Sequence, residues 1–145
     1  MSELLLVDGY NVIHAWPDLK ALLRHSLEDA RDRLVERLAV YSQVSGDDVT
    51  VVFDAHRTTA LAAAEDVQNG VRIVFTRKGL SADHVIERMA YAVTNHGDLL
   101  TVATSDRFQR DLVRGMGGAV ISSPELERRV VEAEKQMSRT VEKYQ

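Results

Sequence analysis

Three aspartates in this sequence follow runs of apolar residues, and together they could bind a metal ion. Asp8 and Asp54 come directly after such runs, and Asp106 follows a third run by three positions. A short, unbroken apolar run is typical of a strand that is buried on both faces of a parallel sheet. The carboxyl ends of parallel neighbours lie at one edge of a sheet, which is where open α/β sheets bind ligands. We therefore expect the three carboxylates to converge.

A second pair of acids stands at the start of a predicted helix. We expect Ser81 to be the N-cap of a helix that runs to about Asn95, with Asp83 in its first turn and Glu87 four residues later on the same face. Carboxylates that crowd together raise each other's pKa unless a cation is present. Oxygen ligands without cysteine suit Mg²⁺ or Mn²⁺, ions that assist phosphoryl displacement. On spacing alone, a metal site and a set of turn residues and helix caps are equally open.

The elements that must position these acids alternate between strand and helix. Apolar runs predict strands at residues 4–7, 49–53, 71–75, 99–103 and 119–122. Helical spacing and capping signals predict helices at residues 18–24, 27–45, 81–95, 107–114 and about 123–143. We expect residues 14–17 to form a loop and Ser123 to cap the last helix, and we assign no element to residues 55–70. The pattern predicts a three-layer α/β/α sandwich with a mainly parallel sheet of about five strands.

Composition narrows the classes of function. The 145 residues contain no repeat or linker, so we expect one domain over 1–145. There is no cysteine, which excludes disulfides and thiolate metal sites. No apolar run is long enough to span a membrane and no secretion signal is visible, so a cytoplasmic location is expected by default. The signatures of dinucleotide, P-loop and zinc-protease sites are absent. A net charge of −4 argues against non-specific coating of nucleic acid but not against a nuclease.

Basic and aromatic residues near the predicted site edge could guide RNA. The basic residues, each near the carboxyl end of a predicted strand, are Arg57, Arg77, Lys78, Arg107 and Arg110. The alternative for each of them is a solvated surface charge. Tyr10 and Trp16 either stack on bases or pack beneath the loop that follows the first strand. Thr104 and Ser105 could donate hydrogen bonds to a ligand or phosphate, and Ser105 could instead cap the next helix.

Four short motifs carry a resemblance to a known family. They are LVDGYN at residues 6–11, VVFDA at 51–55, SADHVIE at 81–87 and ATSD at 103–106. In this order they resemble the motifs of NYN domains, a branch of the PIN-like ribonucleases. With the AWP that follows the first motif, the chain resembles the bacterial YacP-like NYN proteins over residues 3–130.

The resemblance implies a divalent-metal-dependent endoribonuclease that cleaves single-stranded RNA and leaves a 5′-phosphate and a 3′-hydroxyl. The residues carried over are three core metal ligands, Asp8, Asp83 and Asp106; two supporting residues, Asn11 and Asp54; and a further acid, Glu87. The resemblance also implies mRNA as the substrate and the ribosome as a partner, which nothing in the composition indicates.

Two other functions remain open at this point. One is a non-catalytic RNA- or ribosome-binding module that keeps a vestigial acidic pocket. The other is a small-molecule phosphohydrolase, which is weakened because no second aspartate stands two positions after Asp8.

Overall fold

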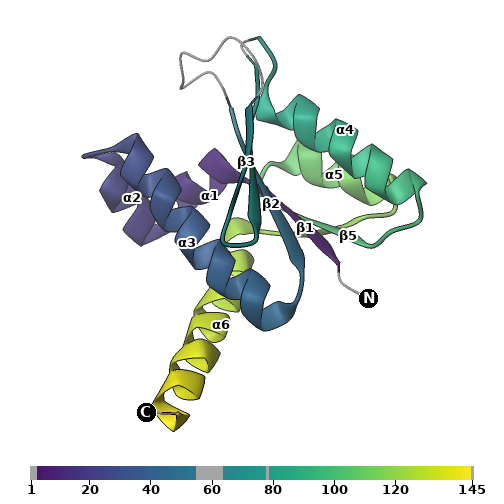
Figure 1. Ribbon diagram of the computed structural model, residues 1–145. Helices are drawn as coiled ribbons and strands as arrows, with labels where there is room; N and C mark the ends of the chain where they lie inside the picture. The colour runs from purple at the N-terminus through teal and green to yellow at the C-terminus, as the bar shows by residue number, and fades with distance from the viewer. Residues whose placement is uncertain (1–2, 55–63, 78, 145) are drawn as a thin grey trace.

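A computed structural model describes residues 3–54, 64–77 and 79–144 and shows a sheet between two layers of helices (Figure 1). The strands in the described part of the chain are β1 (Leu4–Asp8), β2 (Asp48–Phe53), β3 (Ala64–Gln68), β4 (Val71–Phe75), β5 (Leu100–Ala103) and β6 (Ala119–Ile121). The helices there are α1 (Gly9–Ala15), α2 (Pro17–Leu23), α3 (Leu27–Ser45), α4 (Ala82–Asn95), α5 (Arg107–Gly115) and α6 (Ser123–Lys143). The predicted α/β class with a mainly parallel sheet is confirmed.

The order of the strands places β1 at the centre of the sheet. The order is β3-β4-β2-β1-β5-β6, and every pairing is parallel except that of β3 with β4. The chain builds one half of the sheet through β2 and β4 and then crosses over β1 to build the other half through β5 and β6. Because the direction of winding changes beside β1, its carboxyl end lies at a topological switch point, the usual ligand site of such sheets.

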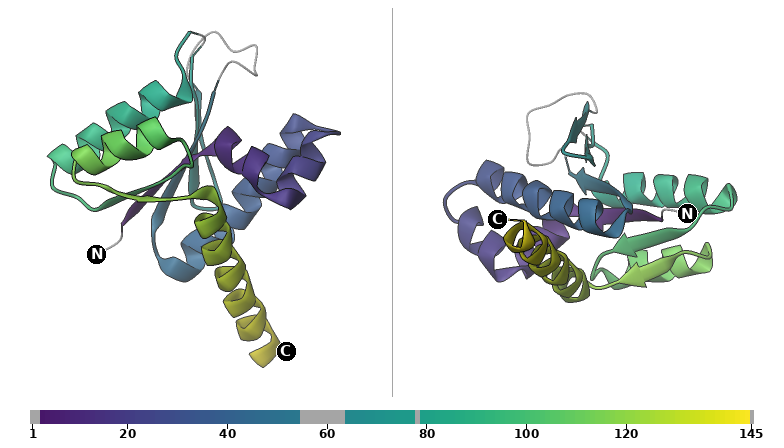
Figure 2. Two further views of the ribbon diagram at one scale, coloured as in Figure 1. Left: turned by 180° about the vertical axis from the view of Figure 1, so that it is seen from behind. Right: turned by 60° about the horizontal axis from the view of Figure 1, so that its bottom comes forward.

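Alternation along the strands divides the core into two layers. Leu6 on β1 lies in one cluster with Ile86 of α4 and Val113 of α5. Val7, the next residue, lies in a larger cluster with α1, α2, α3 and α6, which includes Leu34. Successive side chains of a strand point to opposite faces, so both faces of β1 are buried. Figure 2 shows α4 and α5 on one side of the sheet and the remaining helices on the other.

The structure contains a helix and a strand that the sequence patterns did not predict. Helix α1 begins directly after β1, although its first residue is Gly9 and most of its residues are poor helix formers, because it buries Val12 and Ile13 in the core. Strand β3 is an antiparallel edge strand that Asn69 and Gly70, both with positive φ, join to β4. An Asn-Gly pair flanked by alternating apolar residues is a strong hairpin signal. Strand β3, AEDVQ, has no apolar run, so the sequence did not predict a strand before this turn.

Helix α6 is anchored along its first half. Its N-cap is Ser122, whose side chain accepts a hydrogen bond from the Glu125 backbone, so the expected cap at Ser123 was wrong by one residue. Leu126 and Val130 are fully buried, whereas Tyr144, just after the helix, is 81% exposed. None of the described helices, α6 included, combines the length and apolar character needed to cross a bilayer.

Gly9 is a position where a side chain would not fit. A Cβ atom there would lie 2.5 Å from two ring carbons of Phe53 and 2.9 Å from the carbonyl oxygen of Val52. Gly9→Ala is therefore expected to lower the free energy of unfolding by about 2–3 kcal/mol, which a urea titration would measure. Gly115→Ala is the matched helical control, since its Cβ would meet nothing within 4 Å. An equal effect of both substitutions would contradict the steric explanation.

Candidate active site

A pocket of about 350 Å³ opens at the carboxyl edge of the sheet. Three of the predicted acids line it: Asp8 at the end of β1, Asp54 directly after β2, and Asp83 in the first turn of α4. The other lining residues are Tyr10, Asn11 and His14 of α1, with Ser81 and Ala82 at the start of α4. The parallel sheet thus brings together acids that lie far apart in the sequence.

Asp8 is the most deeply placed of these acids, with 8% of its surface exposed. The pKa of Asp8 is raised to about 6, mainly by burial and to a smaller extent by the charges of Asp83 and Asp106. The Thr104 hydroxyl opposes this rise, because it donates a 3.1 Å hydrogen bond to Oδ2 of Asp8. The ionised form of Asp8 is therefore less favourable in the folded protein than in water, and a cation in the pocket would stabilise it.

Asp83 and Asp106 are held by the same residue, Gln109. The Gln109 side-chain amide donates to Oδ1 of Asp83 at 3.3 Å, and its backbone N–H donates to Oδ1 of Asp106 at 2.8 Å. Asp106 is thus the N-cap of α5, not Ser105. Partial burial raises the pKa of Asp83, as do the charges of Asp106 and Asp54. Gln109 was overlooked in the sequence, although an acid followed three residues later by glutamine is a helix-start signal.

Asn11 holds the loop that carries Asp106. Its Oδ1 accepts hydrogen bonds from the Ser105 backbone N–H at 2.9 Å and from the Ser123 hydroxyl at 2.7 Å. The Ser123 backbone N–H donates in turn to Oγ of Ser105 at 3.2 Å. The amide oxygen of Asn11 therefore connects α1, the loop after β5 and the start of α6. Ser123 is central to this arrangement, and no local sequence signal identified it as such.

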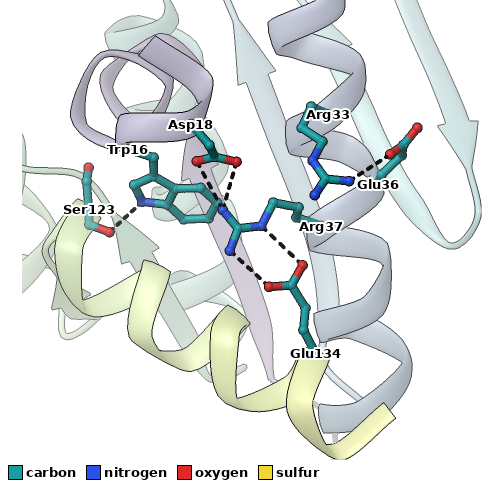
Figure 3. Close-up of polar contacts among 7 residues, drawn as sticks. All are labelled: Trp16, Asp18, Arg33, Glu36, Arg37, Ser123 and Glu134. Carbon is teal, nitrogen blue, oxygen red and sulfur yellow. Dashed lines mark hydrogen bonds and ion pairs between the residues drawn. The ribbon is translucent and has the colours of Figure 1, made fainter. Parts of the chain in front are cut away.

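The two aromatic residues expected to contact RNA differ in exposure. Trp16 is fully buried: its Nε1 donates to the Ser123 carbonyl at 2.8 Å, and the Arg37 guanidinium lies 4.8 Å from its ring centroid (Figure 3). The prediction that Trp16 stacks on RNA bases was therefore wrong, and the packing alternative holds. Tyr10 is half-buried and lines the pocket, with its ring centroid 5.3 Å from that of Phe53.

The acids of the pocket are the right type of ligand for a hard cation such as Mg²⁺, but their side chains are not arranged around a common point. The pocket presents carboxylate oxygens, the ligands that Mg²⁺ and Mn²⁺ prefer, and the pKa values of Asp8 and Asp83 are raised. Within the described ranges, however, no three acidic or histidine side chains form a group that could hold an ion. Asp106 acts electrostatically on Asp8 and Asp83 but does not line the pocket. Glu87 lines a neighbouring groove instead.

Five basic residues were predicted to contact RNA, and the three that the structure describes lie outside the pocket lining. Arg77 and Arg107 are exposed, and Arg110 is half-buried with Nη1 donating to the Thr104 carbonyl at 3.4 Å. Arg57 and Lys78 lie outside the described residues. The contacts of these five residues with RNA stay predictions.

Comparison with known proteins gives consistent matches. Residues 5–145 match the family described as the YacP-like NYN domain. The chain is 40% identical over 141 residues to the uncharacterized protein YacP of Bacillus subtilis (strain 168), covering 97% of this chain and 82% of that protein. The crystal structure of Rae1 (YacP) from Bacillus subtilis superimposes with a TM-score of 0.85 at 40% identity, covering 98% of this chain and 81% of that one. A mutant of that protein superimposes with a TM-score of 0.84 at 39% identity, covering 98% and 83%.

Proposed function

The chain belongs to the YacP-like NYN domain family, and on this basis we propose that it is a divalent-metal-dependent endoribonuclease that hydrolyses single-stranded RNA. NYN domains are PIN-like nuclease domains, and PIN-like nucleases generally use divalent metals. The observation that carries the proposal is the placement of Asp8, Asp54 and Asp83 around one pocket at the switch point of the sheet. Two of these acids, Asp8 and Asp83, have raised pKa values, and perturbed carboxylates in a pocket are typical of functional sites.

In this proposal Asp8, Asp83 and Asp106 would hold the ion, which requires the three side chains to move closer together than they lie in this structure, and Asp54 would add negative charge at the pocket wall. Bound Mg²⁺ or Mn²⁺ would polarise the phosphodiester and lower the pKa of a water. Thr104 orients Asp8 through its hydroxyl, and Gln109 orients the other two ligands. We expect hydrolysis to leave a 5′-phosphate and a 3′-hydroxyl.

For the substrate we propose mRNA, presented in association with the ribosome. This part rests on the family resemblance. In the described part of the chain the pocket is open at the surface, which suits an unpaired strand that bends its phosphate toward the acids.

The test is cleavage of a long, lightly structured mRNA with Mn²⁺ or Mg²⁺, with and without translating ribosomes. We expect cuts with 5′-phosphate ends that disappear with EDTA and in Asp83→Asn and Asp106→Asn. Asparagine is as good an N-cap as aspartate, so Asp106→Asn keeps the start of α5 and removes only the charge. Cutting by both variants at the wild-type rate would contradict the proposal. RNA or ribosome binding without cleavage in any lane would favour the binding module instead.

A further inference from the structure

A second groove lies beside the acidic pocket, between α4 and α5. It has a volume of about 200 Å³ and is called the α4/α5 groove here. Its lining residues are Ser81, Asp83, His84 and Glu87 on the α4 side and Phe108, Gln109 and Leu112 on α5. Because Ser81 and Asp83 line both hollows, the groove continues directly from the acidic pocket. A chain with a phosphate at the acids can therefore extend a neighbouring group into the groove.

Phe108 gives the α4/α5 groove an exposed aromatic rim. Its side chain is 74% exposed, whereas the next residue, Gln109, is 3% exposed and faces α4. Leu112, one helical turn after Phe108, is half-buried and adds apolar surface. An exposed ring above an apolar surface offers a planar group a place to stack, and stacking on aromatic side chains is how proteins hold unpaired bases.

The polar part of the α4/α5 groove is rich in acceptors. Glu87 is exposed and presents a carboxylate, four residues after Asp83 on the same face of α4. Asp83 adds a second carboxylate to the same lining, whereas Oε1 of Gln109 is buried and is not presented to the groove. Such a lining suits a ring that carries N–H donors and disfavours one that presents mainly acceptors. Adenine, cytosine and guanine each carry an exocyclic amine, and uracil has none.

We propose that the α4/α5 groove binds the RNA base next to the phosphate held at the acidic pocket, by stacking on Phe108, and that Glu87 selects a base with an exocyclic amine. The inference rests on the proposed function, because it requires RNA at the acidic pocket. It assigns Glu87 a role in selecting the base, which agrees with its place outside the pocket lining.

The stacking step is tested by binding without cleavage. The full chain is titrated in Ca²⁺, a hard cation that takes oxygen ligands as Mg²⁺ and Mn²⁺ do, into short, labelled single-stranded RNAs of mixed sequence, and fluorescence anisotropy gives the dissociation constant. Phe108→Ala should weaken binding by a factor of about 5 to 150, since stacking contributes about 1–3 kcal/mol per base, and Phe108→Trp should retain it. Tyr91→Ala is the matched control, because Tyr91 is 61% exposed on α4 and lines neither hollow.

The outcomes separate the two proposals. Binding by Phe108→Ala within about twofold of the wild type would overturn the α4/α5 groove and leave the nuclease proposal intact. If the wild type bound no RNA in this assay, the groove proposal would fail, and cleavage of mRNA with translating ribosomes would decide the nuclease proposal separately. Equal weakening by Tyr91→Ala would show a general effect of the surface and would also overturn stacking at Phe108.

The selection step is tested with oligouridylates in which one uridine is replaced by adenosine, cytidine or guanosine at each position in turn. The wild type should bind more tightly when an amine-bearing base stands at one particular position. Glu87→Gln should reduce that preference severalfold, because the side chain loses its charge and one acceptor. Glu132→Gln, at an exposed position on α6, should leave it unchanged. A preference that survives in Glu87→Gln, or no preference in the wild type, would overturn selection by Glu87.

Discussion

Asp8→Asn is expected to abolish RNA cleavage and, at neutral pH, to make the folded protein more stable. Loss of a proposed metal ligand removes charge stabilisation worth several kcal/mol in the transition state, so we expect the rate to fall at least about a hundredfold. The same carboxylate is buried beside two other acids, so its ionised form destabilises the fold when no cation is bound. A side chain that is needed for activity but opposes stability is typical of a functional site.

The sign and size of the stability effect follow from the pKa of Asp8. Its ordinary value is 3.8 and its value in the folded protein is about 6, so the folded state holds a proton that the unfolded state releases between these pH values. The free energy of unfolding therefore falls as the pH rises from about 4 to about 6. The difference of about two pKa units corresponds to about 3 kcal/mol at pH 7. Asparagine is always neutral, and its Oδ1 can still accept the Thr104 hydrogen bond.

Urea unfolding in EDTA at pH 4 and pH 7 measures this effect. The free energy of unfolding of Asp8→Asn should exceed that of the wild type by about 2–3 kcal/mol at pH 7 and by much less at pH 4. Added Mg²⁺ or Mn²⁺ should stabilise the wild type more than the variant, since an ion that binds only the folded state raises its stability. Asp98→Asn, an exposed control, should have little effect at either pH. A destabilised Asp8→Asn at pH 7 would contradict the electrostatic explanation.

Arg37→Ala is expected to cause the largest loss of stability, about 3 kcal/mol. Arg37 is only 7% exposed and joins three helices: its guanidinium donates to both Asp18 oxygens at 3.2 Å and to Glu134 at 2.9 and 3.1 Å, and it lies over the Trp16 ring (Figure 3). Removing one partner of a buried ion pair leaves the opposite charges uncompensated, which typically costs about 3–5 kcal/mol. We expect the lower end of this range because Asp18 and Glu134 are partly exposed, with side chains 43% and 32% accessible, so water still solvates their charges.

Arg33 provides a matched control on the same helix. Its 3.4 Å ion pair with Glu36, also drawn in Figure 3, is exposed on both sides, so Arg33→Ala should change stability by less than about 0.5 kcal/mol. Arg37→Met keeps the packing on Trp16 without the charge, so its loss of stability should lie between those of Arg37→Ala and Arg33→Ala. Urea titrations of the three variants measure these differences. An Arg37→Ala loss no larger than that of Arg33→Ala would show that the charges are not coupled to folding.

Arg37 is also connected to the acidic pocket through a chain of contacts. Trp16, which Arg37 covers, donates to the Ser123 carbonyl, and the Ser123 hydroxyl donates to Asn11 in the pocket wall. We therefore expect Arg37→Ala to reduce RNA cleavage as well, under conditions where the variant is still folded.

The elements that were predicted well are those with local signals. Unbroken apolar runs place the strands that the sheet buries, such as β1, because a strand covered on both faces needs no polar positions. Helix starts such as Ser81 follow from the hydrogen bond that a side-chain oxygen offers to the next turn, and Ser81 does accept from the His84 backbone. The parallel order then brings the strand-end acids to one edge of the sheet, as expected from residue types alone.

Other features depend on partners that are distant in the sequence. The side chain of Trp16 bonds to a residue 107 positions away, and that of Asn11 to one 112 positions away, so local patterns could not show whether these side chains face RNA or the interior. Glu87 and Asp83 share a helix face, yet the packing of α5 against α4 places Glu87 in the groove and outside the acidic pocket. The layers of the fold and the acids at the ends of its strands could be predicted, because short-range apolar spacing and parallel topology specify both. Which of these side chains share a pocket could not be predicted, because that depends on how the helices pack across the sheet.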